Sequence, residues 1–136
     1  MQFKEKPIPF FKVEDWICGI PDYYTNITTN EKKLWEKCKQ GDQLSSVHPK
    51  GHYFTYTKIN KNTPIPTLIS GSKHFHYKEP RPLSRNEMIV CSSFPIDYNW
   101  STWGEEKKKW AMGMSVPPFM IQRIALEIIE QWNLKD

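Results

Sequence analysis

The sequence predicts an α+β fold: a small, irregular β-structure with short helices, followed by a longer C-terminal helix. The stretch from His52 to Ile59 is aromatic and β-branched, which suits a strand. Thr28 and Glu31, and again Ser84 and Glu87, have the spacing of a capping box that begins a helix. Near the C-terminus, apolar residues recur at the spacing of one helix face. This stripe comprises Ile121, Ile124, Ala125, Ile128, Ile129 and Trp132.

Length and composition restrict the class of protein. The 136 residues suffice for about one domain, and 38% hydrophobic with 25% charged residues excludes a disordered tail. No apolar run approaches the roughly 18 residues that a bilayer span needs, and no secretory signal is present. The formal charge of +4 is compatible with a polyanionic partner but does not require one. The scattered Cys18, Cys38 and Cys91 indicate reduced thiols, so we expect an intracellular protein.

Two helices are expected in the N-terminal part of the chain. Residues 13–17 favour a short helix that ends at Gly19. The first capping box opens a second helix over residues 31–39, and Gly41 is placed to stop it. Three residues of that helix share one face and are expected in the core: Leu34, Trp35 and Cys38.

The centre of the chain is expected to contain the β-structure. The strand over residues 52–59 is followed by a proline-rich loop over residues 60–66 and a short strand over residues 67–69. In a second alternating stretch, His74 and His76 fall on one face, where we expect polar readers of a ligand or surface residues.

The C-terminal part is expected to be helical with turns between the helices. The second capping box predicts a helix over residues 85–91, and residues 97–104 are turn-like. Residues 107–109 are three lysines, expected as a solvated surface run, with phosphate contact as the weaker alternative. Ser115 is the candidate N-cap of the last helix, whose first turn tolerates the prolines at 117 and 118.

No pattern in the chain supplies chemistry of its own. His48 and His52, like His74 and His76, join no cysteine or carboxylate cluster with zinc spacing, so no metal site is expected. The six glycines are isolated, which excludes a phosphate-binding loop. No nucleophile elbow or Ser-His-Asp order is visible.

Two segments resemble sequence motifs of the DNA cytosine-5 methyltransferases. Residues 81–87, Arg-Pro-Leu-Ser-Arg-Asn-Glu, and residues 94–98, Phe-Pro-Ile-Asp-Tyr, resemble motif IX. Residues 113–118, Gly-Met-Ser-Val-Pro-Pro, resemble motif X. The chain is therefore similar to the C-terminal part of such an enzyme, with a phage- or virus-like branch as a candidate origin. The resemblance implies a target recognition region over residues 1–80, a motif IX-like segment over 81–100, and a motif X-like loop with the C-terminal helix over 101–136.

The resemblance also implies what the chain does not contain. The family's nucleophile is a cysteine after a proline, whereas the three cysteines here follow Ile17, Lys37 and Val90. The family's Phe-x-Gly-x-Gly cofactor loop and Glu-Asn-Val motif are missing too. We therefore expect no catalytic residue here and no activity of this chain alone. The expected partners are double-stranded DNA and a protein or missing N-terminal domain that carries the cofactor loop and the cysteine.

The resemblance assigns roles to particular residues. The implied reaction transfers a methyl group from S-adenosylmethionine to C5 of cytosine, in a restriction-modification context. The cofactor would be bound mainly by the missing part, with Ser115 and Val116 completing its pocket. Arg81, Ser84 and Glu87 would organise the domain. The residues implied in DNA contact are Thr67, Leu68, Lys73, His74, His76 and Lys78.

Two other interpretations stay open. The chain is a non-catalytic DNA-binding module or a decayed methyltransferase remnant, or else an unrelated RNA- or protein-binding α+β domain. Met114 stands where the family has asparagine, and Asn86 where it has arginine. The intact helix spacing and capping signals favour a divergent enzyme part over a decayed copy.

Overall fold

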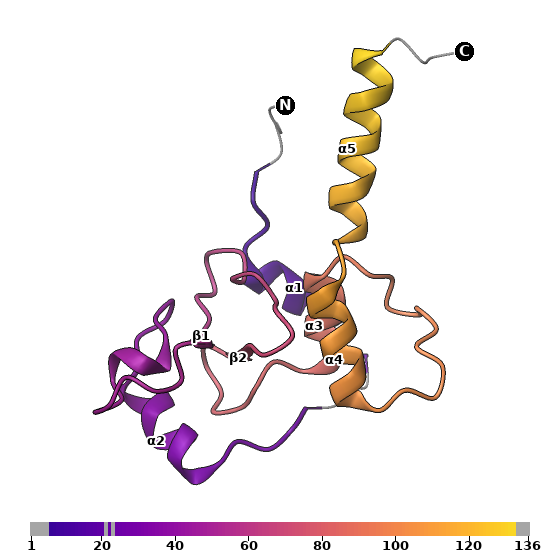
Figure 1. Cartoon of the computed structure of the whole chain (residues 1–136). Coiled ribbons are helices and arrows are strands. Elements are labelled where there is room, and N and C mark those ends of the chain that lie inside the picture. Colours follow the sequence, from indigo (N-terminus) through magenta and orange to yellow (C-terminus); the bar gives the residue numbers. More distant parts are fainter. Residues whose placement is uncertain (1–5, 21, 23, 133–136) are drawn as a thin grey trace.

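Short helices surround a small parallel sheet, and a longer helix follows at the C-terminal end (Figure 1). The computed structural model describes residues 6–20, 22 and 24–132. The predicted α+β class is confirmed. In chain order the elements are α1 (Phe10–Ile17), α2 (Thr29–Lys37), the 3-10 helix η1 (Leu44–Ser46), β1 (Tyr56–Lys58), β2 (Lys73–Phe75), α3 (Arg85–Cys91), α4 (Glu105–Met114) and α5 (Pro118–Gln131).

The sheet is a parallel pair of three-residue strands, in which Thr57 lies opposite His74. Single antiparallel bridges extend it on both sides, from Gln43 to Thr57 and from Phe75 to Pro82. The predicted long strand over residues 52–59 is thus mostly loop, and the predicted strand over residues 67–69 is wrong. Within residues 67–69, the Ile69 amide donates to the Ser72 Oγ at 3.1 Å instead of to a neighbouring strand.

Two apolar clusters form the core. One joins α1, the end of β1 and the start of the α3 region through Phe10, Val13, Ile59 and Leu83. The other joins α2, η1 and β2, through Leu34, Cys38, Leu44 and Phe75. The predicted core face of α2 is confirmed for Leu34 and Cys38, with Trp35 packed against them. An isolated pair of such short strands is marginal in water, so these clusters hold it in place.

Both predicted capping boxes are present. Thr28 and Glu31 exchange side-chain and backbone hydrogen bonds at the start of α2, and Ser84 and Glu87 do the same at the start of α3. The predicted stop at Gly41 is wrong, because α2 ends at Lys37 with Cys38 as its C-cap. Gly41, at φ +93°, instead belongs to the turn that brings its amide within 2.7 Å of the Lys58 carbonyl oxygen.

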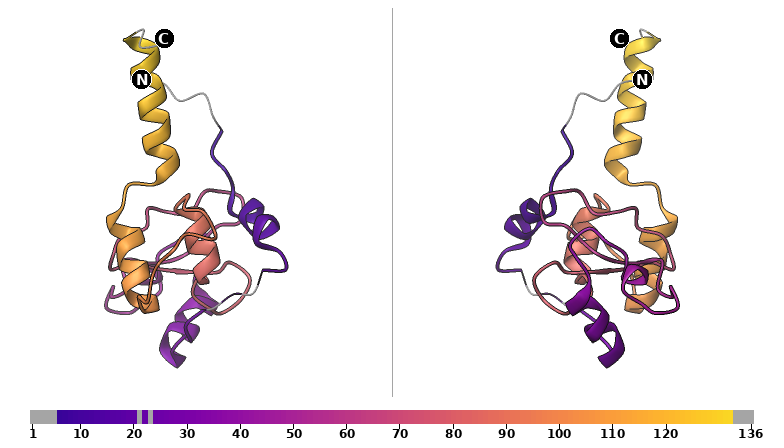
Figure 2. Two further views of the ribbon diagram at one scale, coloured as in Figure 1. Left: turned by 90° about the vertical axis from the view of Figure 1, so that its right-hand side faces the viewer. Right: turned by 90° about the vertical axis from the view of Figure 1, so that its left-hand side faces the viewer.

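Helices α4 and α5 follow one another at an angle. Helix α4 contains residues 107–109, so this predicted solvated run is helical, and it packs beside α3. Ser115 ends α4 rather than capping α5, because its Oγ donates to the Met112 carbonyl oxygen at 2.8 Å and Pro117 stands at the N-cap of α5. Helix α5 extends away from the rest of the described chain in every view (Figures 1 and 2). No helix among the described residues is long and apolar enough to cross a membrane.

Candidate functional site

The segment between β2 and α3 is fixed by a network of charges around Glu87. Arg81 donates from its two terminal nitrogens to the Glu87 carboxylate at 2.8 and 2.9 Å, and its Nε donates to Glu79 at 2.6 Å. Glu87 also accepts the Ser84 amide at 2.6 Å. Burial raises the pKa of Glu87, but these hydrogen bonds from Arg81 and Ser84 outweigh it, so its pKa is lowered. Arg81 and Ser84, two of the residues expected to organise the domain, thus both donate to the third, Glu87.

His76 is a buried anchor of the same segment. Its Nδ1 accepts the amides of Lys78 at 3.2 Å and Glu79 at 3.1 Å, so the ring hydrogen lies on Nε2. Nε2 lies 2.9 Å from the Glu14 carboxylate of α1, and the side chain is 2% exposed. Both nitrogens therefore have protein partners, and the surface position expected for His76 is wrong.

His74 is also buried. Its side chain is 5% exposed, and burial lowers its pKa to about 4. At neutral pH the ring is uncharged and cannot neutralise a phosphate. The alternation of the two histidines left a surface position open for both, but both side chains are buried. A surface role for His74 is therefore wrong as well, for the same physical reason.

The two lysines predicted to contact DNA differ from each other. Lys73 lies 2.7 Å from Glu31, the capping carboxylate of α2, and is partly covered. Lys78 is exposed in the turn after His76. Of these two side chains, only Lys78 is well placed to meet a polyanion without first breaking an ion pair.

Thr67 and Leu68 lie in an exposed loop between the two strands. The loop is anchored at its start, where the first amides of α1 donate to the carbonyl oxygens of Thr63 at 3.0 Å and Lys61 at 3.1 Å. At its end, the Ser72 amide and hydroxyl close a turn onto Ile69. Thr67 is exposed and Leu68 half-buried between these anchors. The loop therefore presents a short, fixed segment to solvent.

Ser115 lines an aromatic hollow of about 290 Å³ at the end of α4. The rings of Phe94, Tyr98 and Trp100 contact one another there at centroid distances of 4.8 to 5.2 Å. Trp100 Nε1 is buried and has no hydrogen-bond partner among the described residues. A buried indole donor usually has an acceptor, so this hollow can receive a ligand that brings one. Val116, the next residue in the chain, does not line the hollow and is 52% exposed.

Helix α5 presents an apolar surface that the described chain does not cover. None of its residues is buried. Ile121, Ile128, Ile129 and Trp132 of the predicted stripe are exposed, as are Phe119, Met120 and Leu126. The stripe is therefore helical as predicted, while the layer that would bury it is absent from the described residues.

The cysteines offer no activated nucleophile. Burial, with the charge of Glu87, raises the pKa of Cys91 to about 12, so its thiol is protonated at neutral pH. Burial, followed by the charge of Asp42, also raises the pKa of the Cys38 thiol. Cys18 is exposed, and it does not follow a proline. The described residues contain no group of three His, Cys, Asp or Glu side chains that could bind a metal ion.

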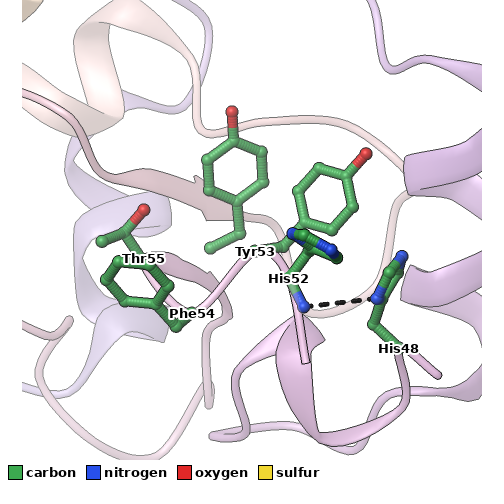
Figure 3. Close-up of a pocket in the computed structure, with 6 residues that line it drawn as sticks. His48, His52, Tyr53, Phe54 and Thr55 are labelled. Atoms are coloured by element: carbon green, nitrogen blue, oxygen red, sulfur yellow. Dashed lines mark hydrogen bonds between the residues drawn. The ribbon is translucent and has the colours of Figure 1, made fainter. Parts of the chain in front are cut away.

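A further open hollow lies in the loop before β1, where no DNA-contacting residue was predicted. Its volume is about 390 Å³. The backbone amide of His52 donates to His48 Nδ1 at 3.2 Å, and both residues line the hollow (Figure 3). The four-residue spacing of these histidines and the aromatic run after them were the available signals. The residues that line it are His48, His52, Tyr53, Phe54, Thr55 and Tyr56.

Comparison with known proteins assigns the chain to a class. Residues 15–130 match the C-5 cytosine-specific DNA methylases, and the chain belongs to this family. It is 32% identical over 107 residues to the type II methyltransferase M.AquIB of Picosynechococcus sp., covering 70% of this chain and 76% of that protein. It is 24% identical over 138 residues to M.NgoFVII of Neisseria gonorrhoeae, covering 89% of this chain.

The two relatives differ in size relative to this chain. The alignment covers only 36% of the gonococcal protein. A 107-residue alignment covers 76% of the cyanobacterial one, so that relative is itself about as short as this chain. No solved structure matches the chain.

Proposed function

We propose that this chain is the target-recognition part of a DNA cytosine-5 methyltransferase and completes the cofactor pocket of that enzyme. It would act with a protein partner or a further domain that carries the cofactor loop and the catalytic cysteine, and would be inactive alone. The proposal rests mainly on the uncovered apolar face of α5, which directly follows the motif X-like turn. A pure DNA binder has no use for such a face.

The cysteines and the cyanobacterial relative support a divided enzyme. This chain contains no Pro-Cys pair, and its Cys91 thiol is protonated at neutral pH. A relative that is called a type II methyltransferase and is about as short as this chain gives a precedent for a small chain. An intracellular location and a restriction-modification role follow from this assignment and belong to the proposal.

The aromatic hollow fits one side of an S-adenosylmethionine site. Aromatic rings suit a purine, and the unpaired Trp100 Nε1 offers a donor to a purine nitrogen. Ser115, which lines the hollow, and Val116, the next residue in the chain, would hold the ligand by backbone groups and apolar contact. When bound, S-adenosylmethionine supplies the methyl group. The residues of this chain would orient it and exclude water.

DNA would be held by residues that lie outside the aromatic hollow. Thr67, Leu68 and Lys78 lie at exposed or half-exposed positions and would contact base edges and phosphates. Lys73 would join them if it exchanges Glu31 for a phosphate. His74 and His76 would support the segment from inside, because both are buried. The Arg81–Glu87 ion pair would fix the position of this region relative to α3.

Methyl transfer from labelled S-adenosylmethionine to DNA tests the proposal. The full chain would be assayed alone and mixed with a protein that carries the cofactor loop and Pro-Cys motif. Activity only in the mixture is the expected result. Loss of that activity on Ser115→Arg, which fills the hollow, would support cofactor-pocket completion. DNA binding without activity in any mixture would favour the non-catalytic module or remnant, and activity of the chain alone would contradict the proposal.

A further inference from the structure

The positive charge of the chain is concentrated in one segment. Residues 28–61 contain seven lysines and no arginine, against three carboxylates, those of Glu31, Glu36 and Asp42. The net charge of this segment is therefore +4, which equals the formal charge of the whole chain, so the charges of all other residues cancel. A surface dominated by one sign of charge attracts a polyanion and increases its rate of association.

Helix α2 presents three of these lysines to solvent. Lys32, Lys33 and Lys37 are exposed, and Glu36 is the one exposed carboxylate of the helix. Glu31, its other carboxylate, is buried on the inner side. Among the described residues, no ion pair involves any of the three lysines. Their charges are therefore available to a ligand.

The lysines of α4, at residues 107–109, have a different electrostatic environment. The Lys108 ammonium lies 2.8 Å from the Glu105 carboxylate, and that of Lys109 lies 3.2 Å from Glu106. A phosphate at this helix would have to compete with both carboxylates, whose attraction to the lysines is already satisfied. The outward side of α2 is therefore the better site for a polyanion, although the lysines of α4 are consecutive in the sequence.

The C-terminal end of α2 is neutralised from inside the protein. A helix C-terminus carries a partial negative charge, which repels phosphate. The Lys58 ammonium donates there to the carbonyl oxygens of Trp35 at 3.0 Å and Cys38 at 3.1 Å, and it lies 3.8 Å from the centroid of the Trp35 ring. The partial charge of this helix end is therefore offset, beside Lys37 and the exposed Lys39.

Helix α2 lies beside the segment that carries Lys78 and away from α5. Trp35 Nε1 donates to the carbonyl oxygen of His76, two residues before Lys78, at 2.8 Å. The Lys73 ammonium lies 2.7 Å from Glu31 of α2. In Figures 1 and 2, α2 and α5 lie at opposite ends of the described structure. A protein that packs along α5 would therefore not need to cover the lysines of α2.

We infer that the outward side of α2, with Lys32, Lys33 and Lys37, and with Lys39 beyond its end, binds phosphates of the DNA duplex outside the recognised sequence. The inference rests on the proposed DNA-binding function and adds a sequence-independent contact to it. Lys32 and Lys37 are about 7.5 Å apart along the helix axis, and duplex DNA carries roughly one negative charge per 1.7 Å of its axis. The three helical lysines can therefore meet about two or three phosphates at once.

The test measures the affinity of the full chain for two duplexes of equal length and unrelated sequence, by fluorescence anisotropy over a series of salt concentrations. Lys32→Gln/Lys33→Gln/Lys37→Gln should reduce the slope of log affinity against log salt by about two, since each phosphate contact contributes roughly 0.9. At low salt the affinity should fall about tenfold or more. Both duplexes should lose affinity by the same factor, because phosphate contacts carry no sequence information.

Two further variants control for charge and for folding. Lys107→Gln/Lys108→Gln/Lys109→Gln in α4 removes the same charge from beside its own carboxylates, and should change the slope by less than about 0.5. Arginine at positions 32, 33 and 37 keeps the charge of α2 and should retain the slope of the unaltered chain. Glutamine and arginine form helices about as well as lysine, so α2 should fold in all of these variants.

Equal changes of slope in the two glutamine variants would show an effect of net charge alone and would overturn the inference, with DNA binding intact. Unequal losses on the two duplexes would overturn it too, because they would indicate contact with bases. Unchanged DNA affinity of the α2 glutamine variant, together with loss of methyl transfer in the mixture with a catalytic protein, would assign this side of α2 to that protein instead. If the unaltered chain bound neither duplex, the proposed function itself would fail.

Discussion

Gly113 lies directly against the backbone of Ser70. A Cβ atom at Gly113 would stand 2.6 Å from the Ser70 nitrogen and 2.6 Å from the Ile69 carbonyl carbon, closer than real Cβ contacts occur. Gly113, the first residue of the motif X-like segment and part of the last turn of α4, therefore contacts the end of the loop that carries Thr67. This contact, in which the glycine has no side chain, joins the segment proposed to complete the cofactor pocket to the loop proposed to contact DNA.

Gly113→Ala should destabilise the protein by about 1–3 kcal/mol, as expected for overpacking against a backbone. In a helix without this contact, the same substitution would stabilise the protein by roughly 1 kcal/mol. The sign of the change in unfolding free energy therefore shows whether the contact is present. Urea unfolding of the full chain measures it. Gly71→Ala, where a Cβ meets nothing within 4 Å, is the control and should change stability by less than about 0.5 kcal/mol.

Glu87→Gln should cost about 1.5–3 kcal/mol of unfolding free energy. The amide can still cap α3, but it loses the charge-assisted bonds from Arg81 in a buried site. Glu36→Gln, an exposed residue of α2, is the comparison and should have little effect. A similar small effect of both substitutions in urea unfolding would contradict a stabilising role for the Arg81–Glu87 pair.

Stability should fall as the pH drops from about 6.5 to about 4. Burial lowers the pKa of His74 to about 4, so within this window the unfolded chain binds a proton that the folded chain does not. The loss is about 3 kcal/mol at roughly 1.4 kcal/mol per pH unit. Lowered pKa values of Glu31 and Glu87 add their loss mainly below about 4.5.

His74→Gln provides the comparison for that pH dependence. Glutamine cannot take up the proton, so the slope of unfolding free energy between pH 6.5 and 5 should become shallower. Denaturant titrations at several pH values measure both slopes. An unchanged slope would show that His74 is not the group responsible.

Ile121→Ser should leave the unfolding free energy of the isolated chain within about 0.5 kcal/mol, because the side chain is 51% exposed and no residue of α5 is buried. The same substitution should reduce self-association in sedimentation experiments and abolish assembly with a catalytic partner. Gln122→Ser on the same helix is the matched control. A large loss of stability from Ile121→Ser would instead show that α5 packs on its own chain.

The sequence was most informative where the signal is local. A capping box needs only two residues three positions apart, so the starts of α2 and α3 could be predicted from Thr28–Glu31 and Ser84–Glu87. The stripe of α5 has one period over several turns and could be predicted for the same reason. Family membership could be predicted from short motifs in a fixed order, which can be recognised without knowledge of the fold.

Features that depend on distant parts of the chain could not be predicted. The pairing of Thr57 with His74 joins residues across a long loop, and no local pattern encodes a parallel register. The burial of His76 depends on Glu14 of α1, 62 positions away. Helix α4 lacks a clear apolar face, so its three lysines predicted a surface segment and gave no sign of a helix. Glu105 and Glu106 in its first turn were a signal that could have indicated the helix.

The anchored loop between the two strands has a consequence for engineering new specificity. Its start is tied to α1 through Lys61 and Thr63, and its end rests on Gly113 at Ile69 and Ser70. Only residues 64–68 lie between these attachments. Ile65 packs against the apolar cluster of the core, so a pentapeptide cassette that keeps an apolar residue at this position could be exchanged here, between fixed ends. Such chimeras would have altered sequence preference while the surrounding scaffold keeps its own contacts.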